Sequence, residues 1–162
     1  MTPKDLSDME CSVARTLDVI GDRWSLLILR DAFYGVRRFD DFARDLGVAR
    51  NILADRLGKL LSKGILEKRQ YEERPPRFEY HLTARGKDLI GVVMAMMRWG
   101  DRWTSPEDPP VKITHTACGH VTTPVVTCSE CGEELHLRDL LADPLPIQGV
   151  DPARVLGAAV GK

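Results

Sequence analysis

Residues 39–64 read FDDFARDLGVARNILADRLGKLLSKG, and this stretch decides the fold. Apolar residues recur at helical spacing in 40–46 and again in 50–63. Gly47 is placed to end the first helix in the left-handed conformation, and Gly64 closes the second. Two helices joined by a short glycine-containing turn form a helix-turn-helix unit, which the sequence therefore predicts.

The segment after this unit has a strand-like pattern. Residues 65–69 and 77–82 are predicted to be two strands. The segment 72–76 between them is predicted to be an unpaired tip, because its two prolines cannot donate to a ladder. A hairpin directly after the second helix is the wing of a winged helix. The predicted fold class is therefore mainly α with a β-hairpin wing, a winged helix-turn-helix.

Helices on either side complete this domain. Residues 12–20 form a predicted helix, and Asp22 is placed to cap a second helix that is apolar nearly all round, as is typical of a central core element. Thr83 is placed to cap one long helix that continues to residue 103. The apolar residues of this long helix include Leu89, Val93, Met96, Met97 and Trp103. This stripe predicts a contact with a second copy of the chain, although packing in the core would explain it too.

The helix at 50–63 has two faces of opposite character. The inward face is predicted to carry Leu53, Leu57, Leu60 and Leu61. The outward face suits base edges, because Arg or Lys can pair with guanine and Asn with adenine. The first residues of a recognition helix reach furthest into the groove, which favours Arg50 and Asn51. Asp55 could accept from cytosine or pair with Lys59 instead, and a merely solvated face is the alternative for the whole helix. The predicted DNA contacts on this helix are Arg50, Asn51, Asp55, Arg56 and Lys59.

Basic side chains flank the helix. Between residues 37 and 77 the chain has 11 Lys and Arg against 7 Asp and Glu, whereas the whole chain has a formal net charge of −1. Such a modest basic zone fits DNA binding that depends on a shaped surface as well as on charge. The predicted contacts with phosphate or the minor groove are Arg37, Arg38, Arg74 and Arg77.

The expected location is the cytoplasm. No apolar run approaches the roughly 20 residues that span a bilayer. The first ten residues lack the basic start and apolar stretch of a signal peptide. The four cysteines are then expected to be reduced thiols, metal ligands or redox sensors rather than a disulfide framework.

Several spaced motifs occur in order between residues 10 and 103. They are Cys11-Ser12-Val13, the run from Asp18 to Trp24, Arg37-Arg38-Phe39, Leu53-x-x-Arg56-Leu57 and the run from Pro75 to Thr83. Together they resemble the HxlR family of winged-helix regulators, a branch close to the MarR type. The resemblance implies a homodimer on a pseudo-palindromic operator, with the terminal helices of the domain forming the dimer contact.

The resemblance also concerns Cys11. Members of the family often have a cysteine at this position, and in several it senses oxidants or electrophiles. Where members commonly have proline next, this chain has Ser12. Cys11 is therefore either a redox sensor, with an oxidant or small molecule as effector, or a buried structural thiol.

The remainder of the chain differs in composition. The proline- and acid-rich segment 104–110 is predicted to be a linker between the domain at 1–103 and a small β module at 111–143. Residues 144–162 form a C-terminal tail with a short predicted helix at 154–160.

Two turns in the module have the same layout. His115-x-x-Cys118-Gly119 and Cys128-x-x-Cys131-Gly132 each place two ligands three residues apart, followed by glycine. Two such turns supply the four N and S ligands of a closed, structural zinc site, so a zinc-ribbon-like module is predicted, with zinc as cofactor. His120 is a competing ligand, and a ribbon with free thiols is the alternative.

The leading interpretation is a sequence-specific transcriptional regulator that binds double-stranded operator DNA as a homodimer and is not an enzyme. One alternative is a basal transcription adaptor, since a winged helix followed by a zinc ribbon also occurs in archaeal transcription factor E. A second is a dithiol redox protein that uses Cys128-x-x-Cys131, although no βαβ context surrounds that motif.

Overall fold

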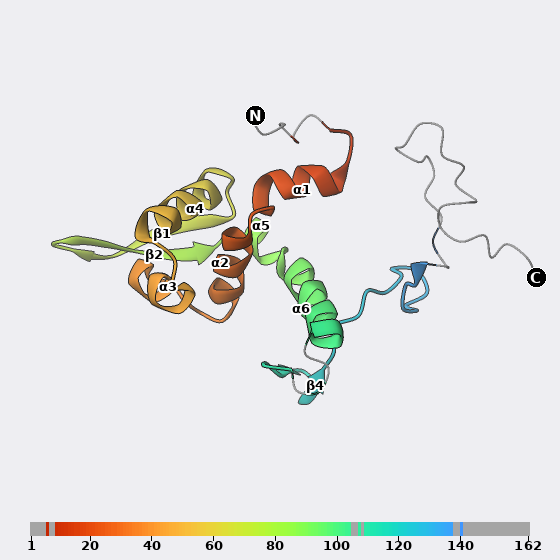
Figure 1. Ribbon diagram of the computed structural model, residues 1–162. Coiled ribbons are helices and arrows are strands. Elements are labelled where there is room, and N and C mark those ends of the chain that lie inside the picture. The colour runs from red at the N-terminus through yellow and green to blue at the C-terminus, as the bar shows by residue number, and fades with distance from the viewer. Residues whose placement is uncertain (1–5, 7–8, 105–106, 108, 138–139, 141–162) are drawn as a thin grey trace, which may run out of the picture. The chain divides into compact units, whose positions relative to one another are not determined.

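The computed structural model describes residues 6, 9–104, 107, 109–137 and 140 (Figure 1). The chain forms two compact units, Met1–Met94 and Ala95–Lys162. Their division falls earlier than the domain end predicted at residue 103. The predicted tail at 144–162 lies outside the described residues. Within the described part, no helix combines the length and apolar character that a membrane span requires.

The first unit has the order of elements that the sequence predicts, except that two helices replace the last one. The elements are α1 (Ser12–Ile20), α2 (Arg23–Phe33), α3 (Phe39–Leu46), α4 (Arg50–Ser62), β1 (Leu66–Glu73), β2 (Pro76–Leu82), α5 (Ala84–Lys87) and the start of α6 (Ile90–Thr104). The predicted glycine stops are confirmed, since Gly47 has a φ of 59° after α3 and Gly64 a φ of 67° after α4. The predicted cap of α2 is also confirmed: the Asp22 carboxylate accepts the N–H groups of Trp24 at 3.1 Å and Ser25 at 3.0 Å.

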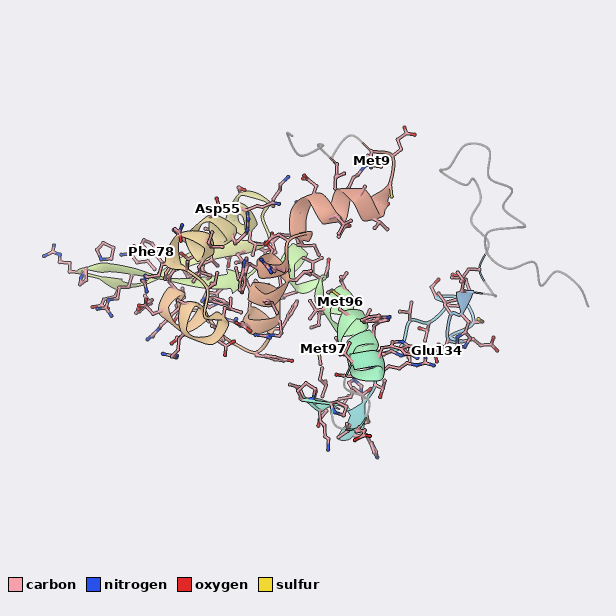
Figure 2. The ribbon with its side chains drawn as sticks, in the orientation of Figure 1. Met9, Asp55, Phe78, Met96, Met97 and Glu134 are labelled. Carbon is pink, nitrogen blue, oxygen red and sulfur yellow. The ribbon has the colours of Figure 1, made fainter. Side chains whose placement is uncertain are left out.

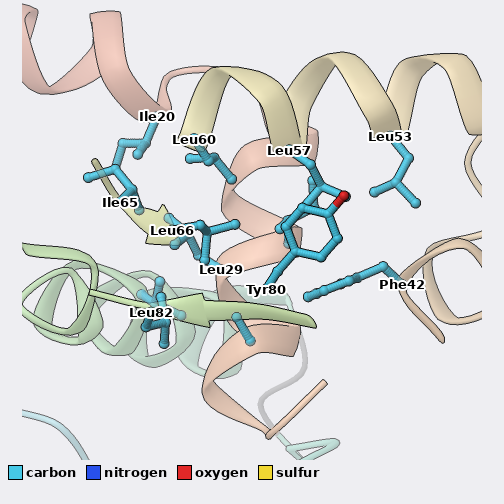
Figure 3. Close-up of a cluster of buried hydrophobic side chains, with 13 residues drawn as sticks. Ile20, Leu29, Phe42, Leu53, Leu57, Leu60, Ile65, Leu66, Tyr80 and Leu82 are labelled. Carbon is cyan, nitrogen blue, oxygen red and sulfur yellow. The ribbon is translucent and has the colours of Figure 1, made fainter. Parts of the chain in front are cut away.

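The core of this unit forms around α2. Ile28 and Leu29 of this helix are fully buried, as are Phe42 of α3 and Leu53 of α4 (Figure 3). Tyr80 of β2 closes the cluster, with its ring edge-to-face with that of Phe42 at 6.4 Å between centroids. The helix-turn-helix and the base of the wing therefore share one core, which fixes α4 relative to the hairpin.

The wing is longer than predicted. β1 and β2 pair antiparallel from Leu66↔Leu82 out to Glu73↔Pro76, with a register shift between Gln70 and Glu72. The unpaired tip predicted at 72–76 is therefore too long: Glu72, Glu73 and Pro76 are paired, and Arg74 and Pro75 form the turn. A proline lacks only the N–H donor, so it can stand at the last pair of a ladder. Figure 1 shows the hairpin reaching past α3 and α4.

The prediction of one long helix after Thr83 is also wrong. Thr83 caps as expected, with its hydroxyl oxygen accepting the N–H of Gly86 at 3.1 Å, but α5 ends at Lys87 and α6 begins at Ile90. A Cβ on Gly86 would lie 2.2 Å from the carbonyl oxygen of Ile65. This close backbone packing holds α5 against the start of the wing, and α6 starts afresh after a turn.

The described residues of the second unit hold little regular structure beyond the end of α6. β3 (Ile113–His115) and β4 (His120–Thr122) form a short antiparallel hairpin. Further along, Thr127 and Glu134 form an isolated antiparallel bridge.

Candidate nucleic-acid interface

The two faces predicted for α4 are present in the fold. Leu53, Leu57 and Leu60 are buried in the core, and Leu61 is half-buried. The outer side carries the exposed residues Asn51, Ala54, Asp55, Gly58 and Ser62, with Ile52 and Lys59 half-buried. Figure 2 shows Asp55 on this outer side of the helix. The polar face of α4 is therefore open to a ligand and is not covered by the first unit's own core.

Two of the predicted DNA contacts, Arg50 and Asn51, lie at the N-terminal end of α4, and they differ in whether their side chains are already bound. The guanidinium of Arg50 lies 2.8 Å from the carboxylate of Asp40 and 4.7 Å from the centroid of the Phe39 ring. Arg50 is therefore held by the first turn of α3 while remaining exposed. The side chain of Asn51 is exposed and makes no hydrogen bond with the described residues.

Arg56 lies on the flank of α4 and contacts two carboxylates. Its Nη1 is 2.8 Å from Asp55 and its Nε is 3.2 Å from Asp22, the residue that caps α2. Asp55 thus pairs with Arg56 rather than with Lys59, the partner suggested by spacing. Burial works to raise the pKa of Asp22, but the hydrogen bonds from Ser25 and the charge of Arg56 together lower it below its usual value. Arg56 therefore braces α4 against α2.

Arg37 and Arg38 precede α3 and differ in role. The half-buried Arg37 donates to the carbonyl oxygens of Ala32 and Val36 at the end of α2. The exposed Arg38 lies 3.3 Å from Glu79 and 4.4 Å from the ring centroid of Tyr71. Arg37 therefore supports the fold, whereas Arg38 presents a cation at the base of the wing.

The wing carries the other two predicted contacts. Arg77 is paired with Glu72 at 3.2 Å. Arg74 at the tip is exposed, and no ion pair to it occurs among the described residues. Sequence reasoning missed the exposed aromatic residues Tyr71 and Phe78, of which Figure 2 shows Phe78 on the hairpin. Their place on strands flanked by basic residues was the available signal.

The predicted zinc ligands form two pairs. Nδ1 of His115 lies 3.3 Å from Sγ of Cys118. Hydrogen bonds from the backbone of Cys131 and Glu130, and from the Cys131 side chain, lower the pKa of the Cys128 thiol. In the described residues, no three His, Cys, Asp or Glu side chains gather closely enough to hold one metal ion.

Cys11, the predicted sensor, lies at the N-terminus of α1. It is half-buried and its side chain makes no capping hydrogen bond.

The core is formed by α2, α3 and α4, the outer polar face of α4 is open, and a two-stranded wing follows. These features define a winged helix-turn-helix DNA-binding protein. Residues 19–108 match the model of the HxlR-like helix-turn-helix family. The chain belongs to this family.

Relatives agree with this assignment. An uncharacterised HTH-type transcriptional regulator of Mycobacterium tuberculosis is 44% identical over 136 residues, which cover 83% of this chain and 86% of that protein. The crystal structure of PA1607, a proposed transcription factor, is 34% identical with a TM-score of 0.78 and covers 87% of this chain and 99% of that one. The redox regulator HypR in its oxidised form is 34% identical with a TM-score of 0.53, over 57% of this chain and 96% of that one. The chain is a DNA-binding transcriptional regulator.

Proposed function

We propose that the chain binds operator DNA sequence-specifically as a homodimer, with α4 in the major groove, and that it acts without enzymatic activity. The observation that carries this proposal is the open outer face of α4, where Arg50 and Asn51 stand exposed at the end that enters a groove most deeply. Membership of a family of regulators favours this function over a basal adaptor or a dithiol redox protein.

The contacts divide into readers of bases and anchors on phosphate. Asn51 makes no side-chain hydrogen bond within the part of the chain that the structure describes, so its amide can pair with adenine without breaking one of these contacts. Arg50 must break its ion pair with Asp40 before it can bind the edge of a guanine. A site that offers this guanine compensates for the lost ion pair, whereas random DNA does not, so the exchange favours a specific site. Arg38, Arg74 and Arg77 are the phosphate anchors, because all three are exposed. Arg37 and Arg56 act by supporting the fold, since they bind the end of α2 and the cap residue Asp22.

The homodimer is supported by exposed apolar side chains on the helices at the ends of the domain. On α6, these side chains are spaced four, three and four residues apart, so they form one stripe: Val92, Met96, Trp99 and Trp103. Trp99 and Trp103 are each 63% exposed. On α1, Val13 and Leu17 are exposed one turn apart, whereas Ile20 is buried. Exposed apolar stripes of this kind are typical of surfaces that bind a partner, and a two-fold pair would present two copies of α4 to DNA.

The experiment is selection of bound sites from random-sequence duplexes by the full chain, followed by footprinting. We expect two inverted half-sites about one helical turn, or a small multiple of it, apart. Arg50→Ala and Asn51→Ala should each relax the preference at one position of the half-site. Unchanged base preference in both variants, with their helical content intact, would refute the assignment of α4 as the reading helix.

A redox response is a second candidate, favoured by the similarity to HypR, a redox regulator. Cys11 would be the responsive residue, since it lies half-buried at the start of α1, beside the exposed Val13. Oxidation of its thiol would then alter the dimer and release DNA. The test compares the effect of peroxide on DNA binding by the parent chain and by Cys11→Ser. An equal effect on both would eliminate Cys11 as the sensor.

A further inference from the structure

We propose that His115, Cys118, Cys128 and Cys131 bind one Zn²⁺, and that the ion joins two preformed turns and thereby folds the module at 113–137. This inference concerns the second unit and does not depend on how α4 reads DNA.

The two turns have the same backbone conformation. The carbonyl of His115 accepts the N–H of Gly119 at 2.8 Å, and the carbonyl of Cys128 accepts the N–H of Gly132 at 2.9 Å. Gly119 has a φ of 73° and Gly132 a φ of 76°. Both glycines thus take the left-handed conformation that glycine adopts without steric cost. Each turn is therefore closed by the same bond and the same residue type, four positions after its first ligand.

Within each turn the ligand side chains already converge. Nδ1 of His115 is 3.3 Å from Sγ of Cys118. In the second turn, the Cys128 sulfur lies within hydrogen-bond reach of the Cys131 side chain. Cys118 and Cys131 are exposed, so packing in a core does not explain these thiols.

Segments next to each turn lie near α6. Arg98 of α6 forms an ion pair with Glu134, two residues after the second turn. Met97 and Arg102 of α6 line a hollow whose other wall includes Ile113 and Val121 of the short β3–β4 hairpin. The segment from Gly119 to Thr127 joins the turns, and nine extended residues reach about 30 Å, so the chain can bring the turns together.

The module has no apolar core of its own to do this. Val121, Val125, Val126 and Leu137 are all more than half exposed. The two hydrogen-bonded strands have three residues each. Chains below about 40 residues usually need a metal, a disulfide or a partner to fold. A metal bound across the two turns supplies that link, so that binding energy becomes folding energy.

The ligand set selects zinc. Three thiolates and one imidazole match the tetrahedral N and S coordination that Zn²⁺ prefers, whereas Mg²⁺ and Ca²⁺ take oxygen ligands. Four protein ligands leave no open position, so the site is structural. His120 is the rival for the nitrogen position, because it pairs directly with His115 across the hairpin. We assign His115, since its ring already contacts Cys118 and its spacing matches that of the second turn.

The experiment uses the full chain, purified under reducing conditions, stripped with a chelator and titrated with Zn²⁺ and with Co²⁺. We expect one ion per chain, and the visible spectrum of tetrahedral Co²⁺ with thiolate charge transfer. Cys118→Ser, Cys131→Ser and His115→Ala should each lose stoichiometric binding, whereas the matched controls His120→Ala and Cys11→Ser should retain it. Zinc should also slow proteolytic cleavage between residues 119 and 127 in the parent chain but not in Cys131→Ser.

Two results would overturn the proposal. The first is substoichiometric metal, or an octahedral Co²⁺ spectrum, in the parent chain. The second is retention of the ion by His115→Ala together with its loss from His120→Ala, which would exclude the assigned nitrogen ligand. DNA binding by each variant, measured in parallel, reports the first unit separately. A failed zinc site therefore cannot be mistaken for a failed recognition helix.

Discussion

Replacing Asp22 by alanine should destabilise the winged helix by about 2–3 kcal/mol. Asp22 caps α2, accepts the hydroxyl of Ser25 and contacts Arg56 of α4. Loss of such a cap costs about 1 kcal/mol. The hydroxyl of the fully buried Ser25 loses its partner, which costs about 1–3 kcal/mol, and the half-exposed pair with Arg56 adds at most about 1 kcal/mol. These contributions are not additive, because all three contacts involve the same carboxylate, so the expected loss lies in the lower part of their sum.

Urea unfolding of the full chain, followed by far-UV circular dichroism, measures this loss of free energy. In thermal unfolding followed by the same signal, the expected fall in Tm for a domain of this size is about 10 °C or more. Asp22→Asn keeps an acceptor for the cap and should lose only about 1 kcal/mol or less. Glu67→Ala, which removes an exposed ion pair with Arg69, is the control and should change stability by less than about 0.5 kcal/mol. A loss from Asp22→Ala no larger than that of the control would refute the reasoning.

The same carboxylate predicts a pH dependence. The pKa of Asp22 is lower in the folded chain than its unfolded value of about 3.9. Its ionisation therefore stabilises the fold fully above that unfolded pKa, and this contribution is lost as the pH falls through the lower folded pKa. The stability difference between the parent chain and Asp22→Asn should shrink on acidification below about pH 4. A difference that stays constant down to pH 2 would contradict this.

Three further predictions concern DNA, the dimer and the glycines. Asn51→Ala should cost about 1–3 kcal/mol at one base pair only, whereas Arg74→Ala should weaken all sequences alike and reduce the salt slope by about 1 in fluorescence anisotropy titrations. Trp99→Glu should convert dimers to monomers in light scattering, because it places a charge in the apolar stripe of α6. Gly86→Ala should lower thermal stability by about 1–3 kcal/mol, since a Cβ there meets the Ile65 carbonyl oxygen. Gly58→Ala meets nothing within 4 Å and should raise stability by about 0.5–1 kcal/mol while weakening DNA binding, because the new methyl lies on the reading face.

Each of these has a result that contradicts it. Equal losses on cognate and random DNA for Asn51→Ala would remove it from base recognition. Lys87→Glu places a glutamate at an exposed residue outside the stripe and changes the charge by two units instead of one. Dissociation by this control as well would point to charge rather than to the stripe. A stable Gly86→Ala protein would mean that α5 can move away from the wing.

The parts of the fold that were predictable are those decided locally. The cap at Asp22 and the stop at Gly47 depend on residues within one turn, so the sequence displays them directly. The inward leucines of α4 follow from a period of 3.6. The break before α6 depends on a distant partner instead, namely the packing of Gly86 on Ile65. The wing tip is local, but the rule that proline prevents pairing fails there, because Pro76 can pair with Glu73 without donating an N–H.

The candidate site divides in the same way. That α4 exposes Asn51 follows from its helical period. The roles of Arg37 and Arg56 did not follow, because an arginine on a flank can reach either solvent or a neighbouring acceptor. Only the folded chain shows that the carbonyl of Ala32 and the carboxylate of Asp22 lie within their reach.

The open side of α4 has a consequence for how such regulators diversify. Asn51 and Gly58 carry no core packing, and the leucines behind them supply the helix's share of the hydrophobic interior. Stability and DNA specificity therefore depend on different residues of the same helix. Substitutions on its outward face can change the DNA sequence that is bound without destabilising the fold, so the same fold can evolve to regulate different genes.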